Sequence, residues 1–188
     1  MKNKVLLSIM SLLLIVLGVM MSITNGKRSQ IAEVRKEVSQ VTKTQKHVTT
    51  QIDNLQTTYN ANDATAKRKL LEFAKAYYTF SSQSDYDKRF SKVSSILALA
   101  KEQQNNLFDS GLDATGGSRI DNLGLTSQYQ TATRYTSDLD NQTIEVLATV
   151  IVQTSGTGQK AINQTILLHG WFDTKTQKLT SIKINQIQ

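Results

Sequence analysis

The sequence predicts an α+β protein with an N-terminal single transmembrane helix, a helical stalk, and helices packed on a four-stranded antiparallel sheet. Three patterns indicate this. A long uncharged run opens the chain, apolar residues then recur every three or four positions, and beyond residue 125 the period falls to two. The expected parts are a cytoplasmic leader (1–4), the transmembrane helix (5–25), the stalk (26–62) and an α+β domain (63–188).

The uncharged run Val5–Asn25 is long enough to cross a bilayer. The hydrocarbon core is about 30 Å thick, so roughly 20 helical residues suffice. A cleaved signal peptide has a shorter apolar region of about 7–15 residues and a small-x-small cleavage site, which "MSITNG" lacks. We therefore expect an uncleaved anchor. A leader of four residues is easily kept in the cytoplasm, so we expect a single-pass protein of the cell membrane with its C-terminal domain extracellular.

The net charge of +7 is concentrated near the predicted membrane segment. Residues 1–60 hold eight basic and three acidic residues, whereas residues 111–188 hold six of each. Lys27 and Arg28 directly follow the apolar run and can meet anionic lipid headgroups. A nucleic-acid surface would need a basic patch with stacking aromatics on the folded domain. Since the C-terminal part shows none, nucleic-acid contact is not indicated.

The stalk carries a heptad pattern. With Ile31 at position a, eight of the nine a and d positions are apolar, which is the period of a coiled coil. These nine residues form the predicted seam: Ile31, Val34, Val38, Val41, Gln45, Val48, Ile52, Leu55 and Tyr59. The segment is therefore expected to lay a narrow apolar stripe against another helix, in a homo-oligomer that is a dimer or a trimer. The alternative is a lone amphipathic stalk that packs on its own head.

Two helices are expected after "NANDAT" (60–65), where the heptad is interrupted. Leu70, Phe73, Ala74 and Tyr77 have the spacing of one amphipathic helix. A capping box of Ser84 and Asp87 is expected to start the second. One face of this second helix would carry Tyr86, Phe90, Val93, Leu97, Ala100 and Leu107. The Gly- and Asp-rich segment 109–124 predicts turns.

Four strands are expected at 125–137, 142–154, 161–172 and 178–186, joined by hairpin-length connections into a meander. Alternation assigns one set of residues to a common side of each strand. The set comprises Leu125, Tyr129 and Tyr135, then Ile144, Val146, Ala148, Val150 and Val152, then Ile162, Ile166, Leu168 and Phe172, and finally Ile182 and Ile184.

No group of residues predicts catalysis, a cofactor or a metal, so we expect no enzyme. The chain has two histidines and no cysteine: His47 lies at an outward heptad position, and His169 lies in a strand beside Trp171. Asp138 and Asp140 are expected to flank a turn, where acids bond to nearby backbone. Gly-Thr-Gly (156–158) joins two strands and is interpreted as a hairpin turn. Trp171 and several tyrosines are core candidates that could also line a pocket: Tyr77, Tyr78, Tyr86, Tyr129 and Tyr135.

The order of these elements, with "LLEFAKAYYTF" (70–80) and "YDKRFSKVSSILA" (86–98), resembles a known family. It is similar to the bitopic assembly component of type IV secretion and conjugation machines, the eighth VirB protein and its Gram-positive transfer relatives. The resemblance implies a nuclear-transport-factor-like cone of helices on a curved sheet. It also implies a non-enzymatic scaffold that contacts other secretion-channel subunits during conjugative DNA transfer.

Two other interpretations stay open at this stage. A short leader, one anchor and a coiled coil also describe cell-division scaffolds that pair through their stalks, although the long meander argues against them. A ligand-binding or enzymatic member of the same cone-shaped fold is the other alternative. Titratable groups that converge inside the cone would favour it, and a filled apolar interior would favour the scaffold. A type IV pilin is disfavoured because the N-terminal apolar segment lacks the acidic residue that pilins carry a few positions into this helix.

Overall fold

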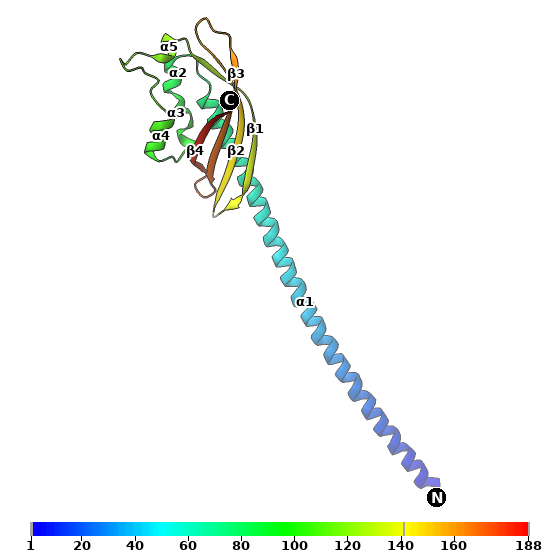
Figure 1. Cartoon of the computed structure of the whole chain (residues 1–188). Helices are drawn as coiled ribbons and strands as arrows, with labels where there is room; N and C mark the ends of the chain where they lie inside the picture. The colour runs from blue at the N-terminus through cyan, green and yellow to red at the C-terminus, as the bar shows by residue number, and fades with distance from the viewer. Residues whose placement is uncertain (1, 141, 188) are drawn as a thin grey trace. The chain divides into compact units, whose positions relative to one another are not determined.

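The computed structural model describes residues 2–140 and 142–187 (Figure 1). Within these ranges, side chains are not described at residues 2–9, 11, 12, 14, 15, 19, 22–26, 29, 138, 139 and 187. The chain divides into two compact units, Met1–Gln56 and Thr57–Gln188. Each unit is described by itself below.

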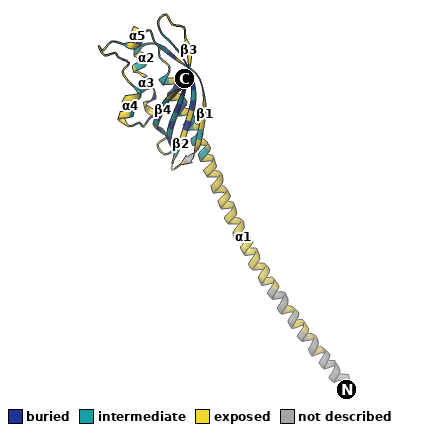
Figure 2. Ribbon diagram, viewed as in Figure 1, coloured by how far each residue is buried: buried dark blue, intermediate teal, exposed yellow. Residues whose placement is uncertain are grey.

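Helix α1 (Lys2–Tyr77) supplies the described part of the first unit and the first element of the second. Its many threonines have modest helix propensity, yet they are accommodated by bonding to the preceding turn. The hydroxyl of Thr42 donates to the Val38 carbonyl at 2.8 Å, and that of Thr49 donates to the Gln45 carbonyl at 3.0 Å. The stalk segment is therefore helical in spite of its composition, with its polar side chains exposed (Figure 2).

The predicted transmembrane segment Val5–Asn25 lies largely among residues whose side chains the structure does not describe, and it stays a prediction. Among the described residues, no helix has an apolar stretch long enough to cross a bilayer.

Helix α1 ends just before the chain pairs with the sheet. Phe80 and Ser127 form an antiparallel bridge, each backbone N–H donating to the other's carbonyl at 2.9 Å. The last turns of α1 bury three of the four predicted stripe residues, with Leu70, Phe73 and Ala74 at 0% exposure, whereas Tyr77 is half-buried. The predicted amphipathic helix is confirmed.

The sheet is a meander of four antiparallel strands in the order β1-β2-β3-β4, as predicted. Its members are β1 (Thr126–Asp140), β2 (Thr143–Ser155), β3 (Ile162–Asp173) and β4 (Lys178–Ile187). Alternation holds in β2, where the burial pattern has a period of two from Ile144 to Val152. Ile162 is the exception in β3: it has the inward parity but is 56% exposed, because it opens the strand at the end of the sheet.

The predicted common side of Leu125, Tyr129 and Tyr135 is wrong. Leu125 precedes β1, and a register shift lies between Tyr129 and Thr131. Because strand side chains alternate, one additional residue exchanges the two faces beyond it. Tyr129 is half-buried, whereas Tyr135 pairs with Leu147 on the outer face and is 60% exposed.

The predicted second helix is also wrong, because the structure divides it into short pieces. These are α2 (Gln83–Asp87), α3 (Arg89–Val93), the 3-10 turn η1 (Ser94–Ile96) and α4 (Lys101–Leu107). Leu97 forms a parallel bridge with Leu179, and the Ala98 N–H donates to the Leu179 carbonyl at 2.8 Å. The sheet edge thus uses backbone groups that a continuous helix would need, and Ala100 is exposed.

The helix cap also differs from the prediction. Ser84 lies inside α2, and Ser82 is the N-cap, whose hydroxyl accepts from the Asp85 N–H at 3.2 Å. Ser82 has the extended backbone that an N-cap requires. The turn-rich segment also contains the short helix α5 (Arg119–Asn122).

The core lies between the inner face of the sheet and the helices. The end of α1 and the short helices lie on that face (Figure 1), and the buried residues of the strands and of the end of α1 form one cluster (Figure 2). The α+β prediction is confirmed at this level. The assignment to the nuclear-transport-factor-like fold stays a prediction.

Substitutions of Leu168 on β3 and Leu147 on β2 test which face of the sheet is inward and which is outward. We expect Leu168→Ala to lower the free energy of unfolding of the second unit by about 2–5 kcal/mol, because Leu168 is 0% exposed and its removal leaves a cavity. Leu147→Ala is the matched control and should cost about 1 kcal/mol or less, because Leu147 is 38% exposed on the outer face. Urea unfolding followed by the fluorescence of Trp171, the single tryptophan, measures both. Equal losses would contradict the assignment of faces.

Candidate functional site

The predicted seam is an exposed apolar stripe on α1. Its apolar members in the first unit are between 46% (Val48) and 71% (Leu55) exposed. The others are Ile31, Val34, Val38, Val41 and Ile52, and Gln45 is exposed as well. Each such side chain would gain about 1.5–3 kcal/mol if fully buried against another surface. An apolar stripe at heptad spacing is therefore the candidate interface of the first unit.

Tyr59, the last seam position, belongs to the second unit and is half-buried there. Its hydroxyl donates to the Ser137 carbonyl of β1 at 3.2 Å. Four residues further on, Asp63 accepts a short hydrogen bond from the Thr136 hydroxyl and pairs with Lys67 at 2.9 Å. The last residue of the seam is therefore partly covered, because Tyr59 contacts β1.

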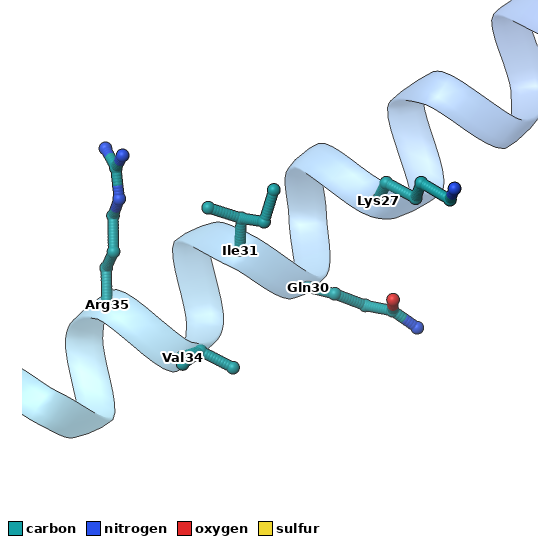
Figure 3. A pocket seen from close by; sticks show the side chains of 5 residues that line it. All are labelled: Lys27, Gln30, Ile31, Val34 and Arg35. Atoms are coloured by element: carbon teal, nitrogen blue, oxygen red, sulfur yellow. The ribbon is translucent and has the colours of Figure 1, made fainter.

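The first turns of the seam combine apolar and cationic side chains. Figure 3 shows Lys27, Gln30, Ile31, Val34 and Arg35, which all project from α1. In this view Ile31 and Arg35 extend from one side of the ribbon, and Gln30 and Val34 from the other. These five side chains border a patch on the surface of a single helix and enclose no cavity. Lys27 and Arg28 are exposed, as contact with lipid headgroups would require.

The second unit contains a cleft of about 280 Å³ between the helices and one end of the inner sheet face. Aromatic rings line its helical side, and strands β1 to β4 line the other. The lining residues are Tyr77, Tyr78, Phe80, Tyr86, Arg89, Ser127, Val152, Thr154, Gln164, Ile166, Ile184 and Gln186. Three of the tyrosines named from the sequence, at 77, 78 and 86, are therefore at this cleft.

Arg89 is the charged residue of the cleft, and its side chain is only 3% exposed. Its guanidinium carbon lies 3.3 Å from the Tyr86 ring centroid and 4.7 Å from that of Tyr77, so the cation is held between aromatic faces. Its Nε donates to the Tyr86 carbonyl at 2.9 Å, and its Nη2 lies 3.3 Å from an Asp109 carboxylate oxygen. A buried cation thus has both a counter-charge and hydrogen-bond acceptors, as burial demands.

Asp109 connects three partners. Its carboxylate accepts from the Tyr86 hydroxyl at 2.5 Å and pairs with Arg119 at 3.0 Å as well as with Arg89. Partial burial acts to raise the pKa of Asp109, but the Tyr86 hydrogen bond and the two guanidinium charges outweigh it, so its pKa lies below the ordinary value. Burial, with the Asp109 hydrogen bond, raises the pKa of Tyr86 to about 12. The carboxylate therefore holds the turn-rich segment against α2 and α3.

The sequence analysis missed Arg89 and Asp109. In "YDKRF" Arg89 is one of several surface-like charges, yet it lies three residues after Tyr86 and four before Val93, so it has the spacing of the apolar face. That spacing was the available signal. Nothing in the sequence pairs Asp109 with Arg89, because the contact depends on how the turn-rich segment folds back.

The outer face of the sheet holds a second polar and aromatic cluster. The His169 and Trp171 rings are in contact, with centroids 3.8 Å apart and planes tilted by 30°, and Lys183 Nζ lies 5.2 Å from the Trp171 centroid. His169 Nε2 is 3.0 Å from the Glu145 carboxylate. Cross-strand pairs of this kind stabilise a sheet. Trp171 therefore lies on the outer face and does not line the cleft.

The remaining candidates do not converge. His47 is exposed on α1, as expected for an outward heptad position. Asp138 and Asp140 fall at the end of β1; Asp140 is the last residue of the strand, next to the connection to β2, and the Asp138 side chain is not described. Gly-Thr-Gly (156–158) connects β2 to β3 and is the hairpin turn expected for it. Across the described side chains, no group of three or more His, Asp or Glu residues is placed to hold a metal ion.

No protein-family model matches the chain, and no curated protein sequence matches it. Among solved structures it is similar to CagV, described as a VirB8 homologue of the type IV secretion system of Helicobacter pylori strain 26695. The TM-score is 0.47 at 10% identity, over 66% of this chain and 99% of that one. It is also similar to VirB8 of Agrobacterium tumefaciens, with a TM-score of 0.44 at 12% identity, over 68% of this chain and 94% of that one. Both are VirB8 proteins, the family named in the sequence analysis.

The Asp109 contacts predict a pH dependence. A carboxyl whose pKa is lowered on folding contributes stability above its ordinary pKa of about 3.9, and this contribution is lost as pH falls through the lower folded value. We expect Asp109→Asn to lower the free energy of unfolding by about 1–3 kcal/mol at neutral pH, because buried Arg89 loses its counter-charge.

The difference between Asp109→Asn and wild type should shrink as pH falls below about 4. Urea unfolding at several pH values, followed by Trp171 fluorescence, measures it. Asp140→Asn, at an exposed position, is the control and should track wild type. A difference that stays constant with pH would contradict the assigned role of the carboxylate.

Proposed function

We propose that this chain is a membrane-anchored, non-enzymatic assembly component of a type IV secretion channel for conjugative DNA transfer. Val5–Asn25 would hold it as a single-pass protein with residues 63–188 outside the cell, where the head would contact other channel subunits. The resemblance seen in the sequence supports this role, together with the order of anchor, stalk, helices and meander. The observation that supports the scaffold role best is the seam, a long stripe of exposed apolar side chains of the kind that helices bury against one another.

The seam partner that we propose is a second copy of the chain. Anchors in one membrane give all copies the same direction, so their stalks would be parallel and in register. In a parallel pair, each g position faces the next e position of its partner. Gln30 then faces Arg35, and Glu37 faces Thr42, so no like charges meet. Confinement to the membrane raises the effective concentration and offsets the small number of ion pairs.

The seam also bears on the number of strands. β-branched residues occupy most a and d positions, including Val34, Val41 and Val48 at d, which favours three strands over two. Gln45 at an a position would set the register, because a polar side chain in the seam is satisfied best by its own counterpart. A dimer with the same parallel register is the alternative.

The absence of cysteine makes the seam directly testable. We expect Gln45→Cys in the full chain to form an intermolecular disulfide in oxidised membranes, since equivalent a positions meet in a parallel bundle. Lys46→Cys, one residue along at an outward position, is the matched control and should crosslink much less. Equal crosslinking of the two variants would contradict the parallel seam.

A second substitution tests the contribution of the seam side chains. Adding Val41→Asp and Val48→Asp to the Gln45→Cys chain should reduce the crosslink at least about tenfold, because burying two carboxylates costs several kcal/mol. Lys43→Asp with Thr50→Asp introduces the same side chains at outward positions and should leave it intact. The unfolding midpoint of the head should be the same in both, because these residues belong to the first unit.

Gene deletion in a conjugating host tests the secretion role. We expect conjugation frequency to fall by orders of magnitude on deletion, and to recover with wild-type chain but not with the Val41→Asp, Val48→Asp chain. Plasmid copy number serves as the control for effects unrelated to transfer. Unchanged transfer after deletion would contradict the proposed function, whatever the crosslinking result.

A further inference from the structure

The inner face of the sheet changes character at the cleft. Along most of β2, β3 and β4 the inward residues are apolar, as at Val150, Leu168 and Ile182. At the cleft, the inward positions instead carry Thr154 on β2, Gln164 on β3 and Gln186 on β4. Thr154 and Gln164 are half-buried and Gln186 is exposed, so a ligand that enters the cleft can reach all three side chains. The polar end of the inner face therefore offers hydrogen-bonding groups to such a ligand.

Several polar groups at this cleft have no described protein partner. The Tyr78 hydroxyl is buried and makes no hydrogen bond within the described part of the chain. Among the described hydrogen bonds, none involves the side-chain amides of Gln164 and Gln186. Ser127, in contrast, is satisfied, since its hydroxyl donates to the Tyr78 carbonyl at 2.7 Å. A buried hydroxyl without a partner is costly, and a ligand that accepts its hydrogen bond would remove that cost.

The charge of the lining selects the sign of the ligand. Arg89 is charged, and no Asp or Glu is among the lining residues. The single carboxylate of Asp109 is shared by Arg89 and Arg119, so these three side chains together carry a net positive charge. The phenol, the two amides and Thr154 can all donate hydrogen bonds. An acceptor-rich anion is therefore favoured and a cation is disfavoured.

The apolar residues that line the cleft favour a flat ligand. Tyr78, Phe80 and Tyr86 line the cleft on its helical side, and the aliphatic side chains of Val152, Ile166 and Ile184 line it on the sheet side. Flat molecules stack well against such surfaces. A volume of about 280 Å³ lies at the small end of ligand sites, and it suits a molecule of one or two rings.

From these observations we propose that the cleft between Tyr78, Arg89, Gln164 and Gln186 binds a small planar aromatic carboxylate. The ligand's ring lies between the aromatic and aliphatic walls, and its carboxylate accepts from the Tyr78 hydroxyl and the glutamine amides. The proposal does not depend on the secretion role, because it uses only contacts within the second unit.

The test uses the full chain in phosphatidylcholine nanodiscs and 2-naphthoate as a fluorescent probe, with empty nanodiscs as the blank. We expect saturable binding of one naphthoate per chain. The cation of matched shape, 2-naphthylmethylammonium, should bind at least about tenfold more weakly, because the lining is positive. Tyr78→Phe keeps the ring and removes only the hydroxyl, so it should weaken naphthoate binding about five- to tenfold.

Tyr135→Phe removes a hydroxyl from the outer face and is the matched control, with binding expected to equal that of wild type. Gln164→Leu with Gln186→Leu should weaken binding as Tyr78→Phe does, and Trp171 emission reports whether each variant is folded. The proposal is overturned if naphthoate shows no saturable binding. It is equally overturned if Tyr78→Phe and Tyr135→Phe bind alike, since the probe then sits elsewhere. Neither result bears on conjugation frequency, which tests the secretion role separately.

Discussion

The packing of one face of α1 on the inner face of the sheet is the contact on which the second unit depends. Leu70, Phe73 and Ala74 are fully buried against inward residues of the strands. Gly170 on β3 shows how close this packing is, because a Cβ at that position would lie 3.1 Å from a Leu70 methyl group. Burying this face gives the meander its core, since a four-stranded sheet with one uncovered apolar face would not be stable alone.

The short helices complete the cover, and they are held in place more by polar contacts than by their own propensity. Isolated helices of five to seven residues are not stable. Here the Leu97–Leu179 bridge connects them to β4, and the Arg89–Asp109 pair connects them to the turn-rich segment. A buried guanidinium needs a specific counter-charge, so this pair favours one arrangement of a region that has little regular structure.

The two units of the chain present different kinds of surface. The seam exposes apolar side chains along α1, and its Thr- and Gln-rich flanks provide few charges for ion pairs. The second unit offers two chemically different surfaces. Its outer sheet face presents the Glu145–His169–Trp171 cluster, and its cleft presents aromatic walls with polar groups at inward positions. A scaffold that also holds a small ligand would combine the two interpretations that the sequence had left separate.

The amino-acid sequence by itself determined the elements whose signal is periodic. The α1 stripe at Leu70, Phe73 and Ala74, the alternation of β2 and the order of the meander all follow from local spacing. Tertiary structure alone decided the rest, because those outcomes depend on partners distant in the sequence. The β1 register shift turned Tyr135 outward, the edge of β4 broke the second helix at Leu97, and chain folding brought Asp109 to Arg89. Periodicity reports which face of an element is apolar, but it does not report which neighbour covers that face.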